Sequence, residues 1–178
     1  MAELQGSHRI LSPGHKVLDL GCWPGGWMEE ASRAVGARGR VVGVDLAEID
    51  PPLEQKNVVS LVGDMTDSAV VERLLEALGG RCNVLLSDAA PKLTGVRERD
   101  DAAEEYLLLA VESLSEELLE TGGDLLIKLL ECPEAQAFQQ RLRARFSTVK
   151  TVKSAATRKG SRERYLLARD FSGPESLE

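Results

Sequence analysis

Four aspartates stand at the ends of short apolar runs in the first half of the chain: Asp19, Asp45, Asp64 and Asp88. Each run has the length and composition of a buried strand. The carboxyl ends of parallel strands meet at one edge of a sheet, so we expect the four carboxylates to gather there. Carboxylates at such an edge can accept hydrogen bonds from ribose hydroxyls or face a cationic group. This pattern predicts a nucleotide-like ligand.

A glycine turn follows the first run, in the sequence Asp19-Leu-Gly-Cys-Trp-Pro-Gly-Gly-Trp27. Its Gly21, Pro24, Gly25 and Gly26 let the backbone turn sharply and let a ligand approach the N–H groups at a helix start. The turn does not have the G-x-G-x-x-G spacing of dinucleotide dehydrogenases. An acid two residues before the first glycine suits S-adenosylmethionine, which carries an ammonium and a sulfonium. The alternative is a plain strand–turn–helix corner.

Lys128 lies inside the apolar run 124–130, where a charged side chain is costly to bury unless it is paired or neutral. Asp88 ends the preceding apolar run and would face Lys128 if the two strands are neighbours. Glu163, an acid within a basic stretch, would complete a Lys–Asp–Glu cluster. The alternative is a lysine at a strand end whose amine reaches solvent. We predict that Lys128 is a functional residue and that Asp88 and Glu163 form a cluster with it.

Apolar runs of strand length alternate with segments of helical spacing along most of the chain. This alternation predicts an α/β fold, with a mostly parallel sheet and helices on both faces. Two strands, 148–153 and 164–169, close the chain. A long helix is expected over roughly 102–120. Its expected inward side chains are Tyr106, Leu109, Ala110, Leu114 and Leu118.

Length and composition indicate a single domain over 1–178. Residues 1–15 are expected to form a lead-in with little pattern, and 171–178 a frayed tail. No apolar run reaches the roughly 20 residues that span a bilayer, so no membrane partner is expected. The three cysteines lie far apart and have no metal-ligand spacing, which predicts small core residues in a cytoplasmic protein. We expect no metal site, and a monomer is favoured.

The net charge of −7 hides an uneven distribution. Eleven basic residues and three acidic ones stand between Lys128 and Arg169. A basic face on an acidic protein is compatible with binding a polyanion, although a solvated surface is the alternative. Arg158, Lys159 and Arg162 lie in a loop just before Glu163, and we predict that they contact the phosphates of such a polyanion.

Six motifs occur in order along the chain. They are the glycine turn of 19–27, Gly43-Val-Asp45, Gly63-Asp64, Ser87-Asp-Ala-Ala-Pro91, Ile127-Lys128 and Ser161-Arg-Glu-Arg-Tyr165. Over roughly 10–170 the chain resembles the FtsJ (RrmJ) ribosomal RNA 2′-O-methyltransferases. The resemblance implies a Rossmann-like methyltransferase fold that depends on S-adenosylmethionine, with a mostly parallel seven-stranded sheet whose last strands are antiparallel. It also implies methyl transfer to a ribose 2′-hydroxyl of RNA, most of all large-subunit ribosomal RNA.

The resemblance assigns roles to individual residues of this chain. Lys128 would be the base, or would only orient the hydroxyl, with support from Asp88 and Glu163. The cofactor-binding residues come from the glycine turn and the strand ends. They are Asp19, Gly21, Pro24, Gly25, Gly26, Trp27, Asp45, Asp64, Met65 and Asp88.

The chain departs from the family pattern in three places. Cys22-Trp23 stands where the family has small residues, and Ala89 where it has methionine. The family's first catalytic lysine lies in an upstream Ser-Arg-Ala-x-x-Lys-Leu segment, and residues 1–178 contain no such motif. The nearest candidates to replace that lysine are His8, Arg9 and Lys16. Two other functions stay open: a non-catalytic RNA-binding or ribosome-assembly factor on the same fold, and a methyltransferase acting on a small molecule.

Overall fold

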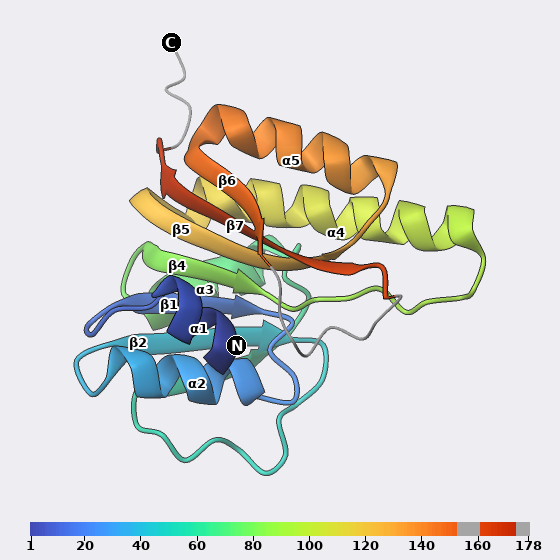
Figure 1. The fold of residues 1–178 in the computed structure, drawn as a ribbon. Coiled ribbons are helices and arrows are strands. Elements are labelled where there is room, and N and C mark those ends of the chain that lie inside the picture. The colour runs from blue at the N-terminus through green and yellow to red at the C-terminus, as the bar shows by residue number, and fades with distance from the viewer. Residues whose placement is uncertain (153–160, 174–178) are drawn as a thin grey trace.

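The structure is a computed structural model, and it describes residues 1–152 and 161–173. In these residues one sheet lies between two layers of helices (Figure 1). The strands are β1 (Lys16–Leu20), β2 (Arg40–Asp45), β3 (Val58–Val62), β4 (Cys82–Ser87), β5 (Leu119–Leu130), β6 (Phe146–Val152) and β7 (Glu163–Phe171). The helices are α1 (Ala2–His8), α2 (Gly26–Val35), α3 (Ser68–Leu78), α4 (Arg97–Leu118) and α5 (Pro133–Arg145).

The strand order is β3-β2-β1-β4-β5-β7-β6. Strands β1 to β5 pair in parallel, and β7 runs antiparallel to its two neighbours, β5 and β6. The prediction of a mostly parallel seven-stranded sheet is confirmed. From β1 the chain passes to β2 and β3 on one side, then returns to β4 on the other side. The connections after β1 and β4 therefore lead from the carboxyl edge to opposite faces of the sheet, and ligands bind at this point in such sheets.

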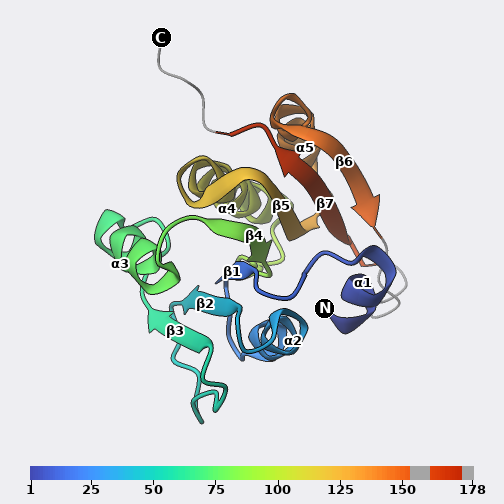
Figure 2. The same ribbon diagram turned by 90° about the vertical axis from the view of Figure 1, so that its left-hand side faces the viewer.

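Helices cover both faces of the sheet, as predicted (Figure 2). α1 and α2 pack on one face, against a core that includes Val17. α3, α4 and α5 pack on the other face, against a core that includes Leu18 and Ile127. Side chains alternate along a strand, so Asp19 and Lys128 lie on the face covered by α1 and α2. No helix in the described part of the chain is long and apolar enough to cross a membrane.

The long helix predicted over 102–120 is α4, and it is turned relative to the prediction. Its second half buries leucines as expected, but Tyr106 and Leu109 are 59% and 49% exposed. The inward positions of its first turns are carboxylates, Asp100 and Glu104. These two acids accept hydrogen bonds from backbone N–H groups of other segments, which allows a polar residue to take a buried position.

Both ends of the chain contribute to the core more than the sequence pattern indicates. The predicted lead-in contains α1, whose Leu4 is buried, and Leu11 after it is also buried. Phe171, the predicted start of a frayed tail, is instead the last residue of β7. Its ring packs on Phe146 with the centroids 5.1 Å apart, because the two residues are partners in the β6–β7 register. Residues 174–178 lie outside the described part of the chain.

Candidate active site

The glycine turn after β1 touches the loop after β4. Gly21 has a φ of +74°, and a Cβ at this position would lie 2.5 Å from the Cα of Ala89. Only glycine combines this backbone conformation with so close an approach. Gly25, with a φ of +105°, is the N-cap of α2 and provides no side-chain cap, so the first N–H groups of the helix stay available to a ligand. Pro24 and Gly26 on either side of it are exposed.

A cavity opens at this edge, beside the ends of β2 and β3. Apolar groups and two carboxylates line it. The lining residues are Gly21, Asp45, Leu46, Gly63, Asp64, Met65, Thr66, Ala89, Ala90, Tyr106 and Leu107. Four of the predicted cofactor-binding residues are among them: Gly21, Asp45, Asp64 and Met65. The cavity therefore lies where the ends of successive strands were expected to form a site.

Apart from Met65, the sequence analysis did not predict the apolar side chains of this lining. Leu46 directly follows Asp45 and is 76% exposed, and an apolar residue next to a strand-end acid is a signal that could have identified it. The sequence places Tyr106 in the core of the long helix, whereas its hydroxyl lies 3.4 Å from the Thr66 hydroxyl at the cavity. Tyr106 could be placed at the cavity only from the orientation of α4 about its axis. That orientation depends on contacts with residues distant in sequence.

Asp45 and Asp64 are held as hydrogen-bond acceptors. One oxygen of Asp45 accepts from the Trp23 N–H at 3.0 Å and the other from the Ala47 N–H at 2.9 Å. Each carboxylate oxygen keeps a lone pair for a ligand hydroxyl. Oδ1 of Asp64 accepts from the backbone N–H and the hydroxyl of Thr66, at 2.9 and 2.8 Å, and these bonds lower the pKa of Asp64. Asp64 is therefore an anionic acceptor at neutral pH.

Asp19 is fully buried, and neither of its oxygens has a hydrogen-bond partner among the described residues. Burial raises the pKa of Asp19 well above its usual value, and the charges of Asp88 and Asp45 add to the shift. A buried carboxyl group without a partner is costly, and a bound cationic group would relieve that cost. This position directly before the glycine turn fits the ammonium of S-adenosylmethionine, as the sequence predicts.

Lys128, Asp88 and Glu163 meet at the carboxyl edge of β4 and β5, as their spacing predicted. The Lys128 Nζ lies 2.5 Å from Oδ1 of Asp88 and 3.7 Å from Oε1 of Glu163. Burial lowers the pKa of Lys128, but the hydrogen bond to Asp88 and the charges of both carboxylates outweigh it, so the net shift is upward. Lys128 is therefore an ammonium at neutral pH. The cluster borders the cavity, because Ala89 and Ala90 of the lining directly follow Asp88.

Trp27 lies beside this cluster and is not part of the cavity lining. Its ring stacks on Tyr165, with the centroids 6.2 Å apart and the planes inclined by 27°. Tyr165 is the partner of Lys128 in the β5–β7 register, so the two side chains share one face of the sheet. Trp27 therefore joins the start of α2 to the strand that holds Glu163. Cofactor contacts by Trp27, and by the other predicted residues outside the lining, stay predictions.

The candidates to replace the family's upstream lysine lie toward the opposite edge of the sheet. Lys16 is the first residue of β1, and its Nζ donates to a carbonyl of the α3–β4 connection at 2.5 Å. The carbonyl of His8 accepts a hydrogen bond from Arg169, which also pairs with Asp124 at 3.1 Å. Asp124 precedes Lys128 along β5 and lies toward its amino end. Arg9 follows His8 directly, so the structure groups none of these candidates with Lys128.

Arg162 makes protein contacts at the start of β7. Its Nη2 lies 2.5 Å from Oδ1 of Asp101, and its Nε and Nη2 donate to the Glu131 carbonyl at 3.1 and 3.0 Å. Arg158 and Lys159, the other predicted phosphate contacts, lie outside the described residues. RNA contact by these three residues stays a prediction.

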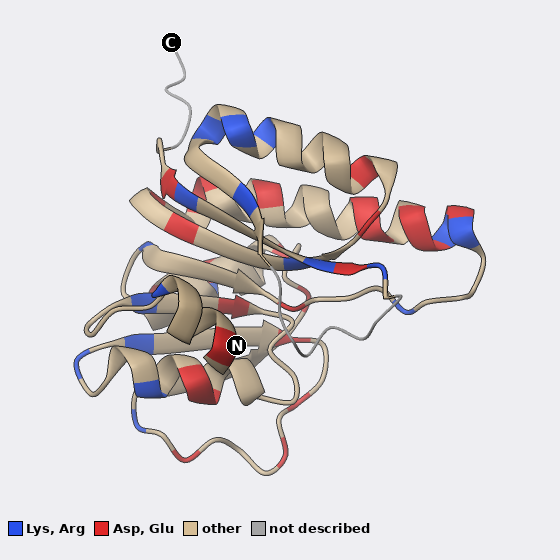
Figure 3. Cartoon of the chain, viewed as in Figure 1, with Lys and Arg blue, Asp and Glu red and all other residues tan. Residues whose placement is uncertain are grey.

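Acids from other parts of the chain pair with arginines of the C-terminal third. Figure 3 shows that positive and negative residues are interspersed over α4, α5 and β7. In the described residues the pairs are Arg141–Glu112, Arg145–Glu116, Arg162–Asp101 and Arg169–Asp124. The excess of positive charge counted along the sequence therefore overstates the positive charge of this surface.

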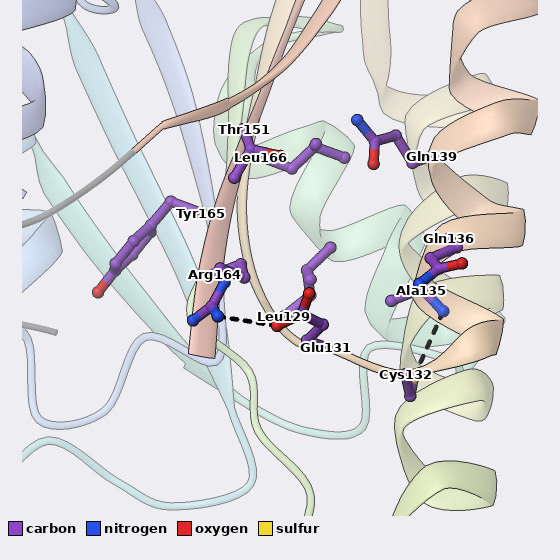
Figure 4. Close-up of a pocket in the computed structure, with 10 residues that line it drawn as sticks. All are labelled: Leu129, Glu131, Cys132, Ala135, Gln136, Gln139, Thr151, Arg164, Tyr165 and Leu166. Carbon is purple, nitrogen blue, oxygen red and sulfur yellow. Dashed lines mark hydrogen bonds and ion pairs between the residues drawn. The ribbon is translucent and has the colours of Figure 1, made fainter. Parts of the chain in front are cut away.

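A second, smaller cavity lies between α5 and the strands β6 and β7 (Figure 4). Its lining residues are Leu129, Glu131, Cys132, Ala135, Gln136, Gln139, Thr151, Arg164, Tyr165 and Leu166. Arg164 pairs with Glu131 at 2.8 Å, and the Tyr165 side chain points away from the other labelled residues (Figure 4). None of the predicted cofactor-binding residues lines this cavity, whereas four of them line the cavity beside β2 and β3.

The three cysteines are free thiols and all are buried, as predicted. Burial raises the pKa of Cys22 and of Cys82 to about 12. Thiols in this state are neutral small core side chains rather than nucleophiles. Within the described ranges, no group of three His, Cys, Asp or Glu side chains is placed to hold a metal ion.

Comparison with known proteins decides the family. The profile of the FtsJ-like methyltransferases matches residues 1–171, nearly the whole chain. The chain belongs to the FtsJ-like methyltransferase family. Ribosomal RNA large subunit methyltransferase E of Methanothermobacter thermautotrophicus is 38% identical over 178 residues, which is 100% of this chain and 84% of that protein. The protein of the same name from Pseudomonas aeruginosa is 39% identical over 174 residues, which is 97% of this chain and 83% of that protein.

Solved structures agree with membership of the FtsJ-like family. A Plasmodium falciparum protein assigned as a ribosomal RNA methyltransferase has a TM-score of 0.83 and 26% identity, over 96% of this chain and 94% of that one. Fibrillarin from Aeropyrum pernix, solved with natively bound S-adenosyl-L-methionine, has a TM-score of 0.65 and 16% identity over 89% and 68% of the two chains, and shows a shared fold only. This FtsJ-like methyltransferase has the Rossmann-like fold, and its cofactor is S-adenosylmethionine.

The residues at the carboxyl edge of this FtsJ-like chain fit that cofactor. Asp45 presents acceptors for two ribose hydroxyls, and Leu46 and Tyr106 provide apolar surface for a flat ring. Asp19 is a buried carboxyl group without a partner, which suits the cofactor's ammonium. When bound, S-adenosylmethionine supplies a methyl group made electrophilic by its bond to a sulfonium sulfur.

Proposed function

We propose that this chain transfers a methyl group from S-adenosylmethionine to a ribose 2′-hydroxyl of RNA, and that its substrate is large-subunit ribosomal RNA. The observation that carries the proposal is the cluster of Lys128, Asp88 and Glu163 beside the cofactor cavity. The names of the bacterial and archaeal relatives support ribosomal RNA as the substrate class.

Lys128 orients the acceptor hydroxyl and stabilises its oxygen. As an ammonium held by Asp88 it has hydrogen bonds to donate and no lone pair to accept a proton. The upward direction of its pKa therefore supports the orienting role over the role of general base, the two roles that the sequence left open. A positive charge beside the oxygen favours the negative charge that develops as the hydroxyl loses its proton. Glu163, with 40% of its side chain exposed, takes that proton and can pass it to solvent.

Most of the remaining acceleration comes from alignment. Holding the hydroxyl oxygen in line with the methyl carbon and the sulfur can supply roughly 7–11 kcal/mol of the barrier. The contact between Gly21 and Ala89 fixes the loops after β1 and β4 against each other. The N–H of Asp88 also donates to the Leu20 carbonyl at 3.1 Å, which holds the cluster beside the glycine turn.

We also propose that the protein acts as a cytoplasmic monomer with RNA as its macromolecular partner. Buried free cysteines support a reducing compartment. Among the described residues, the most exposed large apolar side chains lie at or after the carboxyl ends of strands or on α4, where cofactor and substrate would cover them. They are Trp23, Leu46, Val62, Leu93, Val96, Tyr106 and Leu109.

Transfer of an isotope-labelled methyl group tests the proposal. The purified protein is incubated with labelled S-adenosylmethionine and either free ribosomal RNA, isolated ribosomal subunits or a small-molecule extract. We expect label in large-subunit RNA, free or assembled. Cofactor binding by calorimetry without transfer to any RNA would indicate a non-catalytic assembly factor, and label only in the extract would indicate a small-molecule methyltransferase.

A further inference from the structure

Arg162 joins three elements at the catalytic edge. Its side chain reaches the first turns of α4, where Nη2 lies 2.5 Å from Oδ1 of Asp101. The same guanidinium donates to the Glu131 carbonyl, just after β5, from Nε at 3.1 Å and from Nη2 at 3.0 Å. Its own carbonyl accepts the Glu131 N–H at 2.8 Å. A planar fork with several donors can hold a carboxylate and a carbonyl at once.

The contacts of Arg162 with Asp101 and Glu131 form a tether between β7, α4 and the end of β5. Glu163 directly follows Arg162 in the sequence. It pairs with Leu130 in the β5–β7 register, two positions from the pair formed by Lys128 and Tyr165. Positions two apart on a strand share a face, so the tether sets the point at which the Glu163 carboxylate approaches the Lys128 Nζ. The 3.7 Å separation of these two groups thus depends on where β7 begins relative to β5.

A second residue of α4, Glu104, also binds the end of β5. Glu104 is buried, and its Oε1 accepts the Leu130 N–H at 2.8 Å. Asp101 and Glu104, three positions apart, lie on neighbouring parts of the helix surface. One turn of α4 therefore contacts the end of β5 through Glu104 and the start of β7 through the ion pair of Asp101 with Arg162.

We propose that Arg162 is a positioning residue, which acts through Asp101 and the Glu131 carbonyl to hold Glu163 against Lys128. This inference rests on the proposed methyl transfer to RNA. It replaces the expectation that Arg162 contacts RNA phosphates, because its guanidinium is already shared between two protein acceptors.

Three variants separate positioning from RNA contact. Arg162→Lys keeps the charge but loses the fork, Arg162→Gln loses both, and Asp101→Asn removes the carboxylate while leaving the arginine. We expect kcat for RNA methylation to fall roughly 10- to 100-fold in all three, since small displacements of reacting groups have effects of this size. The KM for S-adenosylmethionine and the salt dependence of RNA binding should stay at their wild-type values.

A phosphate contact would give a different pattern. Arg162→Lys would then keep near wild-type kcat, Arg162→Gln would flatten the log–log salt slope of RNA binding by roughly 0.7, and Asp101→Asn would free the guanidinium and tighten RNA binding. That pattern would overturn the inference.

Arg141→Gln is the matched control. Arg141 lies on α5 and pairs with Glu112 of α4, with 2.8 Å between the Arg141 Nε and the Glu112 Oε2. The substitution therefore removes an ion pair of the same kind from α4, at a position away from Lys128. We expect an unchanged kcat. A control as slow as the Arg162 variants would show that loosening α4 alone accounts for the loss, and would overturn the inference. If a variant fails to fold by circular dichroism, Arg162→Lys, the mildest of the three, decides alone.

The wild-type protein separates this inference from the proposed function. A wild type that transfers no methyl group to RNA overturns the proposed function, and the inference with it. An active wild type with equally active Arg162 and Asp101 variants overturns the inference only.

Discussion

Asp19 is fully buried and Lys128 is partly buried, and their surroundings favour a neutral Asp19 and a charged Lys128. Burial raises the pKa of Asp19 and favours its neutral form. Lys128 is also partly buried, but Asp88 at 2.5 Å keeps it charged. The sequence indicated both residues, because an acid before a glycine turn and a lysine in an apolar run are unusual. It could not give their charge states, which depend on how deeply the fold buries each group and on whether it brings a charged partner to it.

Asp19→Asn should make the cofactor-free protein more stable at neutral pH. In the unfolded chain Asp19 ionises above about pH 4, whereas its raised pKa favours the protonated form in the fold. The folded state then binds more protons, so this group lowers the free energy of unfolding as the pH rises from about 4 toward the folded pKa. We expect the free energy of unfolding of the variant, measured in urea at pH 7.5, to exceed that of wild type by about 1 kcal/mol or more.

The difference in the free energy of unfolding between Asp19→Asn and wild type should shrink at pH 4.5. The affinity of the variant for S-adenosylmethionine should be lower than that of wild type. Equal stability of the two proteins at both pH values would contradict the assignment of Asp19 as an unpaired buried carboxyl group.

Asp45→Ala should weaken S-adenosylmethionine binding by about 1.5–3 kcal/mol, the scale for hydrogen bonds to a charged group. Its carboxylate lines the cavity and keeps acceptor capacity beyond the two backbone N–H groups it already binds. Isothermal calorimetry measures the change. Glu48→Ala, which removes an exposed acid three residues away, is the control and should bind as wild type does. An affinity of Asp45→Ala within twofold of wild type would exclude the ribose contact.

The strands and the glycine turn could be predicted from the sequence because their signals are local. Apolar runs, glycines and strand-end acids mark β1 to β5 without reference to the rest of the chain. The rotation of α4 could not be predicted, because its inward Glu104 is stabilised by the Leu130 N–H, a partner distant in sequence. A pattern of apolar residues alone places Tyr106 inside, and so hides a residue of the cavity lining.

Gly21→Ala tests the turn as an element. Its φ of +74° costs an L-residue roughly 1–2 kcal/mol, and the new Cβ would meet the backbone of Ala89. We expect a loss of at least that much in the free energy of unfolding, together with loss of cofactor binding. Gly14→Ala is the control, since Gly14 has a similar φ of +89° but open space around its Cα. It should show the backbone cost while cofactor affinity is kept. Full cofactor affinity in Gly21→Ala would contradict this account of the turn.

The surface charge of the folded protein differs from the charge read along the chain. The basic C-terminal third meets acids of α4 and β5 through pairs such as Arg145–Glu116 and Arg169–Asp124. These pairs join residues far apart in sequence, so a count within one segment could not anticipate them. The parallel pairing of β1 to β5, by contrast, was expected from the alternation of strands and helices.

Arg158 and Lys159 are the predicted phosphate contacts that remain after Arg162 is assigned to positioning. If each neutralises one phosphate, changing both to Ala should flatten the log–log salt slope of RNA binding by about 1.4. S-adenosylmethionine affinity should stay the same. Binding titrations from low to moderate salt give the slope, and an unaltered slope would place the RNA elsewhere on the protein.

The central claim is that Lys128 directs the methyl group to a ribose 2′-oxygen, and mapping the labelled product in wild type and Lys128→Ala tests it most directly. A 2′-O-methyl group leaves no free hydroxyl to attack the next phosphodiester, so alkali releases the label in a resistant dinucleotide. We expect this product from wild type and none from Lys128→Ala, with cofactor affinity within twofold in both proteins. Label in mononucleotides, or transfer at the wild-type rate by Lys128→Ala, would contradict the claim.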